Sequence, residues 1–269
     1  MEWSLALISQ GISSTIERSD SGWGLVVDSE QHDSAVITIE RYRIENQHWP
    51  WRQKVREQIL FDWGSLAWAL LLGLFYWVDT ERFSLREQGV MNATAVSAGE
   101  WWRLFTAMFL HADAAHLAMN ASIGLFLLGL AMGGYGTGIG LLAAFLAGAG
   151  GNIATWLIFK THLSLGASGM VMGCLGLIAA ESVSSAPRPI PIKYLLSGLA
   201  GGGLLFVLLG LSPDSDVLAH LGGFVAGVVL GVVLGRFPGI TQSSTANLVA
   251  GLGFSALVLL TWGLALIGV

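Results

Sequence analysis

The sequence predicts an all-α polytopic membrane protein that carries a small α+β domain ahead of its membrane helices. Of its 269 residues, 54% are hydrophobic and only 12% are charged, whereas a soluble domain carries about 25% charged residues. Many of the charged residues fall within residues 1–58, and the chain from Phe61 onward is apolar and rich in glycine. This separation predicts two domains, residues 1–58 and residues 59–269.

The charge balance and the cysteine content narrow the classes of function. A net charge of −5 argues against a nucleic-acid partner. Cys174 is the single cysteine, so the chain cannot form an internal disulfide, and we expect it to pack in the core. We expect no cofactor and no metal, because His116 and His220 lack a carboxylate or cysteine at ligand spacing.

Residues 1–58 are predicted to form a small cytosolic α+β domain followed by a basic linker. The pattern predicts a helix ended by Gly11, two strands joined by a turn at Ser19–Gly22, and a second helix. In chain order these elements cover Trp3–Gln10, Ile12–Glu17, Trp23–Val27 and Ser29–Ile44. A domain of this size buries little apolar surface, so it is marginal alone or pairs with another copy.

Seven apolar segments follow, each near the ~20 residues that an α-helix needs to cross a bilayer. They lie at about residues 61–78, 115–133, 138–159, 167–183, 193–210, 217–235 and 246–267. Basic residues in short loops mark the cytoplasmic side, and here they precede the first segment and follow the fourth and sixth: Arg52, Lys54, Arg56, Arg188, Lys193 and Arg236. The sequence therefore predicts a multi-pass membrane protein with a cytoplasmic N-terminus and an external C-terminus. We expect it to lie in the cell (inner) membrane.

The first external loop, residues 79–114, is too long for a simple connection. Within it, Glu100–Phe105 combines aromatic and charged residues, which suits a segment lying in the membrane interface. An ordinary belt of interfacial aromatics would give the same pattern at Trp101. In the other loops and helices, we expect Lys160 and His162 to be solvated and Asn152 to form a hydrogen bond between helices.

Polar residues on three different segments are predicted to lie at one depth. At about 1.5 Å of rise per residue, Ser168 and His220 lie roughly 22 and 24 Å above the cytoplasmic ends of their helices. On the second segment, Asn120 and His116 lie at about 21 and 27 Å by the same measure. All four fall in the outer layer of a hydrocarbon core about 30 Å thick. Ionisable groups inside a membrane usually face one another or a polar cavity.

Glycine stripes predict that the fourth and sixth segments pack against each other. The stripe on the sixth segment begins beside His220, and that on the fourth begins beside Ser168. The stripes consist of Gly223, Gly227, Gly231 and Gly235 on the sixth segment, and of Gly169, Gly173 and Gly176 on the fourth. Small residues let two helix backbones approach closely, so facing stripes would bring Ser168 and His220 together.

Ser168 and His220 have the chemistry of a nucleophile and its base. A serine hydroxyl needs a base within hydrogen-bond reach, and a neutral histidine suits that task near pH 7. Attack on an amide creates an oxyanion that needs hydrogen-bond donors. His116, Asn120 and the backbone N–H of Ser168 could supply them. No acid stands out as a third member, since Asp113 and Asp216 lie in loops, so a Ser–His dyad is predicted.

These residues resemble the motifs of the rhomboid family of intramembrane serine proteases. Gly166-Ala167-Ser168-Gly169 resembles the family's GxSG motif, and Ala219–Gly227 resembles its AHxxGxxxG helix. His116–Asn120 matches its HxxxN pair, and Trp102-Arg103 matches its WR motif. The motifs occur in the family's order, and the resemblance covers about residues 60–235.

The resemblance implies a rhomboid six-helix core with a water-accessible cavity, extended here by a C-terminal seventh helix. It implies Ser168 as nucleophile and His220 as general base, with His116, Asn120 and the Ser168 amide forming the oxyanion hole. Substrates would be single-pass or other transmembrane proteins, cleaved within the lipid bilayer near its outer face. The resemblance also implies that His111 supports its loop, and that residues 1–58 are similar to the small cytosolic domain of some bacterial rhomboids.

Two other functions remain open from the sequence. A non-catalytic rhomboid-like protein would bind membrane helices without cutting them, although its usual mark is a missing serine or histidine. A transporter or channel could use His116 and His220 as a proton path, but the inverted repeats or broken helices of such proteins are not clear here. The oligomeric state stays open.

Overall fold

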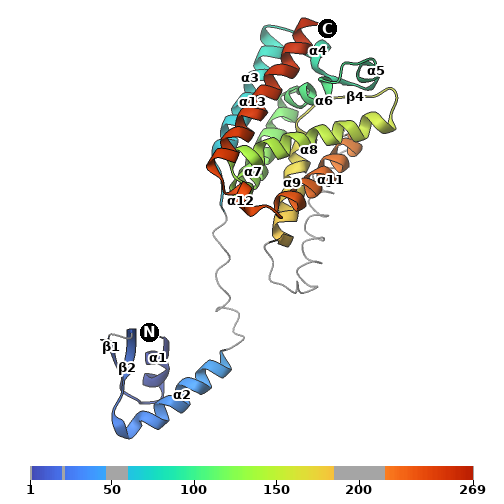
Figure 1. The fold of residues 1–269 in the computed structure, drawn as a ribbon. Coiled ribbons are helices and arrows are strands. Elements are labelled where there is room, and N and C mark those ends of the chain that lie inside the picture. The colour runs from blue at the N-terminus through green and yellow to red at the C-terminus, as the bar shows by residue number, and fades with distance from the viewer. Residues whose placement is uncertain (1, 20–21, 47–59, 185–215, 269) are drawn as a thin grey trace. The chain divides into compact units, whose positions relative to one another are not determined.

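The computed structural model describes residues 2–19, 22–46, 60–184 and 216–268. The chain divides into two compact units, Met1–Ile59 and Leu60–Val269. Each unit has its own hydrophobic core, and Figure 1 draws the helices and strands of both. The basic linker and the predicted span at 193–210 lie outside the described residues.

The N-terminal unit packs two helices with a β-hairpin. Its elements are α1 (Glu2–Ser9), β1 (Thr15–Ser19), β2 (Gly22–Val26), the 3₁₀ helix η1 (Ser29–Gln31) and α2 (His32–Glu45). The strands are antiparallel, with Ile16 opposite Leu25. The buried core is small, because it consists of Leu7, Ile12 and Ala35. So few buried side chains supply little hydrophobic stabilisation.

The second unit is a bundle of long helices joined by short elements (Figure 1). In chain order the long helices are α3 (Gly64–Glu81), α7 (Ala114–Tyr135), α8 (Thr137–Ile158), α9 (Ser168–Ser184), α11 (Val217–Leu234) and α13 (Ser244–Ile267). Among the described residues, four of them are long and apolar enough to cross a membrane, namely α7, α8, α11 and α13. These helices support a multi-pass membrane protein.

The other two long helices differ from that pattern for simple reasons. Helix α9 has only 17 residues. Helix α3 has 18 residues, but its last turn contains Asp79 and Glu81, which lower its mean hydropathy. Length and composition therefore support fewer spans within the described residues than the seven predicted.

Side-chain caps fix where several helices begin. Asp113 accepts a hydrogen bond from the backbone N–H of His116 at the start of α7. Ser243 accepts one from Ala246 at the start of α13. Asn247 on α13 accepts bonds from the first N–H groups of α8 at 3.1 and 3.2 Å. Each cap satisfies N–H groups that the helix itself leaves without an acceptor.

The long loop between α3 and α7 is folded. It contains α4 (Arg86–Gly89), β3 (Met91–Asn92), α5 (Ala93–Ser97), α6 (Arg103–Thr106) and the 3₁₀ helix η3 (Ala107–Phe109). Strand β3 pairs antiparallel with β4 (Leu163–Ser164), which precedes α9. A further short helix, α12 (Pro238–Thr241), lies between α11 and α13.

Arg103 holds this loop together from inside. Its guanidinium donates to Glu100 at 2.6 Å and to the carbonyls of Glu87 and Val90 at 2.9 and 3.0 Å. Trp102 is also buried, whereas Trp101 is exposed. The predicted interfacial segment at Glu100–Phe105 is therefore partly built into the folded loop.

Helices α9 and α11 pack with their backbones in direct contact. A methyl group added at Gly223 would lie 2.2 Å from the carbonyl oxygen of Gly169. One at Gly227 would lie 2.1 Å from the carbonyl oxygen of Gly173. The two glycine stripes thus face each other, as their spacing predicted, and no side chain fits between them.

This contact makes a stability prediction. We expect Gly227→Ala to lower the free energy of unfolding by about 1–3 kcal/mol, the usual cost of overpacking. Gly263→Ala on α13 is the matched control, because no atom of the described residues lies within 4 Å of a methyl group there. Thermal unfolding in detergent would compare the two variants, and equal melting temperatures would contradict the contact.

Candidate active site

The conformation of the segment before Ser168 depends on Gly166. Gly166 has a φ of +125°, a conformation that residues with a side chain rarely adopt. A methyl group at Gly166 would also lie 2.8 Å from Nε2 of His116, and the Gly166 N–H donates to the carbonyl of Ala107 at 3.0 Å. The chain then enters α9, of which half-buried Ser168 is the first residue.

The two predicted oxyanion residues lie on α7 beside that segment. His116 is half-buried and Asn120 is buried. The Asn120 amide nitrogen donates to the carbonyl of His116 at 3.1 Å, and an amide carries a second hydrogen. The same nitrogen would lie 3.8 Å from a methyl group at Gly166. Both side chains therefore reach the backbone two residues before Ser168.

His220 lies in the first turns of α11 and is buried. Its neighbour Ala219 faces the neighbour of Ser168, since a methyl group at Gly169 would lie 3.5 Å from the carbonyl oxygen of Ala219. Ser168 and His220 are thus each one residue away from the same helix–helix contact. The residues predicted from the sequence come from the N-terminal parts of α7, α9 and α11.

His111 and Asp113, which lie just before α7, have pKa values shifted from their ordinary ones. His111 is fully buried, and its ring lies edge-on to that of His116 with the centroids 5.2 Å apart. Burial lowers the pKa of His111 to about 4, and the neighbouring His116 and Arg86 act in the same direction. His111 is therefore neutral near pH 7. The hydrogen bond from the backbone N–H of His116 lowers the pKa of Asp113, which keeps a negative charge at the helix start.

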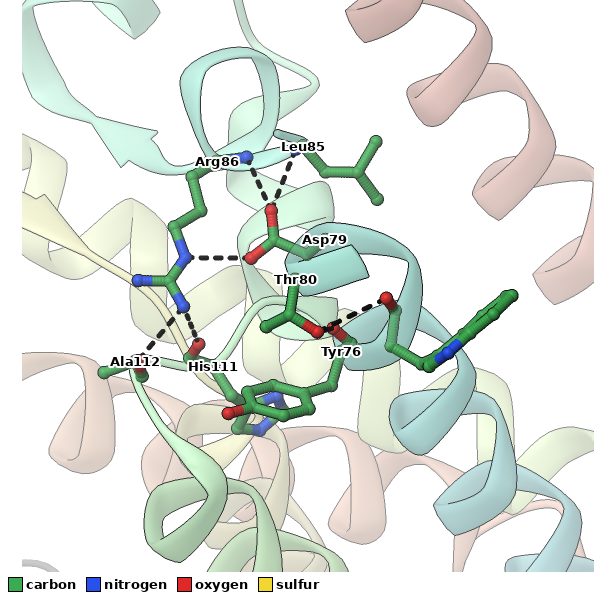
Figure 2. A network of polar contacts seen from close by, with 8 residues as sticks. Tyr76, Asp79, Thr80, Leu85, Arg86, His111 and Ala112 are labelled. Carbon is green, nitrogen blue, oxygen red and sulfur yellow. Dashed lines mark hydrogen bonds and ion pairs between the residues drawn. The ribbon is translucent and has the colours of Figure 1, made fainter. Parts of the chain in front are cut away.

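A hydrogen-bond network around Arg86 holds the residues that precede α7 in place (Figure 2). Arg86 donates from Nε to Asp79 at 2.8 Å, and from Nη2 to the carbonyls of His111 and Ala112 at 2.7 and 3.0 Å. Asp79 in turn accepts the backbone N–H groups of Leu85 and Arg86. The network ties the end of α3 to the residues that lead into His116. Sequence reasoning missed it, because Asp79 and Arg86 look like ordinary loop charges.

A second network was also missed, and it corrects one prediction. His162 was expected to be solvated, but its Nε2 atom lies 2.8 Å from the carboxylate of Asp216. Asp216 itself was left without a role. The only signal in the sequence was the position of Asp216, which suits an N-cap just before the apolar run of α11. The prediction for Asn152 is confirmed, since it donates to the carbonyl of Leu104 on α6 at 2.7 Å.

A cavity of about 720 Å³ lies elsewhere in the second unit. It is lined by the ends of α3 and α13 and by the loop after α3, including Phe75, Arg82 and Trp262. None of the predicted site residues lines it. In the part of the chain that the structure describes, no group of three or more His, Cys, Asp or Glu side chains could hold a metal ion.

Comparison with known proteins gives consistent matches. Residues 98–237 match the model of the Rhomboid domain family. The chain is 32% identical over 191 residues to Rhomboid protease GluP of Bacillus subtilis, covering 65% of this chain but only 36% of that protein. It is 30% identical over 213 residues to Rhomboid protease AarA of Providencia stuartii, covering 64% of this chain and 74% of that protein. Rhomboid-like protease 3 of Toxoplasma gondii is 30% identical over 192 residues, covering 66% and 72% respectively.

The buried His111 predicts a loss of stability in mild acid. The unfolded chain takes up this proton near pH 6.5 but the folded chain only near pH 4, so stability falls as the pH drops through that window. At one pKa unit per ~1.4 kcal/mol, His111 should lower the free energy of unfolding by about 2 kcal/mol between pH 7 and pH 5. Unfolding of wild type and His111→Phe at both pH values would isolate this term. A variant with the wild-type pH dependence would contradict it.

Proposed function

The chain belongs to the rhomboid family, and from this premise we propose that it is an intramembrane serine endopeptidase. The observation that carries the proposal is that Ser168 and His220 flank one backbone contact, inside the region that matches the family model. Named proteases among the similar proteins support the same reading. We further propose that the N-terminal unit is cytosolic and that the C-terminus faces the outside of the inner membrane, from the distribution of basic residues.

Catalysis would run through a Ser168–His220 dyad. His220 takes the proton of the Ser168 hydroxyl while Oγ attacks the carbonyl carbon of the scissile peptide bond. The tetrahedral intermediate collapses, the C–N bond breaks, and His220 gives its proton to the leaving amine. A water molecule, deprotonated by His220, then attacks the acyl-enzyme. The ester C–O bond breaks, and His220 returns the proton to Oγ of Ser168. Burial of His220 limits competition from bulk water for its hydrogen bonds.

The oxyanion would be held by groups beside the Gly166 segment. His116 and Asn120 both approach the backbone there, so the second amide hydrogen of Asn120 and a ring N–H of His116 can point at a carbonyl oxygen bound near Ser168. The backbone N–H of Ser168 adds a third donor, because it belongs to the first turn of α9, where the helix provides no acceptor. Such donors are most effective where little water competes.

The proposed substrate class is transmembrane proteins. The candidate residues occupy the N-terminal parts of apolar helices, and in the orientation proposed above these ends lie in the outer part of the bilayer. Amides of a transmembrane helix are hydrogen-bonded internally. A scissile bond can reach Ser168 only after local unwinding, so helix-breaking Gly or Pro near that bond should favour cleavage.

An activity-based probe tests the dyad directly. We expect a fluorophosphonate to label the purified wild-type protein in detergent and to leave Ser168→Ala unlabelled. His220→Ala should lose about 10²–10⁴-fold in labelling rate, the usual contribution of a general base. Ser255→Ala is the control, because Ser255 lies exposed on α13 and its hydroxyl donates to the carbonyl of Gly251 within its own helix.

Absence of labelling in a folded wild type, beside an active rhomboid as positive control, would overturn the proposed protease. The non-catalytic rhomboid-like protein that binds membrane helices would then be the better account. Labelling that survives in Ser168→Ala would place the nucleophile on another residue.

A second prediction concerns the substrate helix. Replacing Gly or Pro near the scissile bond of a model transmembrane substrate with Leu should slow cleavage in vesicles, because the bond then stays in a helix. The same replacement two turns away serves as the control. Equal cleavage rates for all three substrates would contradict the need for unwinding.

A further inference from the structure

Asp216 begins the helix that carries His220. Its Oδ1 atom accepts the backbone N–H of Ala219 at 2.9 Å, and its own carbonyl accepts the N–H of His220 at 3.0 Å. The carboxylate is therefore the side-chain N-cap of the first turn of α11. His220 lies one turn further along, so its position follows from that of Asp216.

The same carboxylate makes two contacts that an N-cap does not need. It accepts the hydroxyl of Thr155 at 3.2 and 3.3 Å, and Thr155 is fully buried on α8. It also pairs with Nε2 of His162 at 2.8 Å. The side chains of Asp216 and His162 are only 11% and 28% exposed, so this pair is less screened by solvent than a surface ion pair.

His162 belongs to the segment that leads to Ser168. Its carbonyl accepts the N–H of Ala93 at 3.0 Å, and its ring stacks on Phe159 with the centroids 5.4 Å apart. Strand β4 follows at once and pairs with β3. The chain from His162 to Ser168 is thus held along its length, with the Asp216 pair at its beginning.

We propose that His162 and Asp216 form a positioning pair that sets how Ser168 and His220 meet. This inference rests on the proposed protease function. The glycine contact between α9 and α11 holds the two helices together along their length, on the C-terminal side of Ser168 and His220. The His162–Asp216 pair joins the segment before Ser168 to the start of α11, on the N-terminal side of both candidate residues. Thr155 links the pair to α8. Ser168 and His220 are therefore braced from both sides.

Substitutions can separate this role from helix capping. In Asp216→Ser the cap is kept, since serine caps as well as aspartate, but the shorter side chain cannot also reach Thr155 and His162. His162→Ala removes the partner instead. His162→Gln keeps a side-chain N–H of similar reach and should rescue the interaction. The exposed pair His32 and Asp33 in the N-terminal unit provides the matched control Asp33→Ser.

Steady-state cleavage of a transmembrane substrate in vesicles is the test. We expect kcat to fall about 10- to 100-fold in Asp216→Ser and His162→Ala, because small misplacements of reacting groups are costly. KM should be unchanged, the double variant should be no slower than the single ones, and His162→Gln should recover most of kcat. Asp33→Ser should match wild type, and melting temperatures should show that all variants are folded.

Each contrary result has its own meaning. An active wild type whose Asp216→Ser and His162→Ala variants keep full kcat would overturn the positioning pair alone. A loss of kcat that follows the loss of folded protein, without rescue by His162→Gln, would reduce the pair to a structural role and overturn the inference. A folded but inert wild type would overturn the proposed function, and the inference with it.

Discussion

The contact between α9 and α11 depends on the absence of side chains. Gly169 and Gly173 present carbonyl oxygens to Gly223 and Gly227 at distances where a methyl group would overlap them. Apolar surface gains little from leaving lipid, so membrane helices associate through close packing. This glycine seam, which consists of the four residues just named, brings the N-terminal ends of α9 and α11 together. The other candidate site residues are arranged around it.

Aspartates add side-chain contacts at the ends of α3, α7 and α11. Asp79 lies in the last turn of α3 and binds Arg86, while Asp113 and Asp216 are the N-caps of α7 and α11. Each accepts backbone N–H groups that have no acceptor within their own helix. Packing therefore sets the distances within the bundle, and these carboxylates set the register of the segments that carry the candidate residues.

Much of this arrangement could be predicted from the sequence, because membrane constraints leave a strong local pattern. The apolar segments match the described helices closely, as α7 at Ala114–Tyr135 shows against a predicted 115–133. The facing of the glycine stripes followed from their spacing of three or four residues. The networks of Arg86 and Asp216 did not follow, because their partners lie 25 and 54 residues away. His162 was misjudged for this reason, since the local sequence around a loop residue does not reveal a carboxylate that is distant in the chain.

The glycine seam also restricts how the protein can evolve. When two side chains collide, a second substitution can shrink the partner and restore the fit. At Gly223 and Gly227 the opposing atom is a main-chain oxygen, which every amino acid has and no substitution can make smaller. A larger residue there has no compensating change directly across the contact. The seam is therefore a one-sided constraint, because a larger residue at either glycine can be accommodated only by moving the two helices apart.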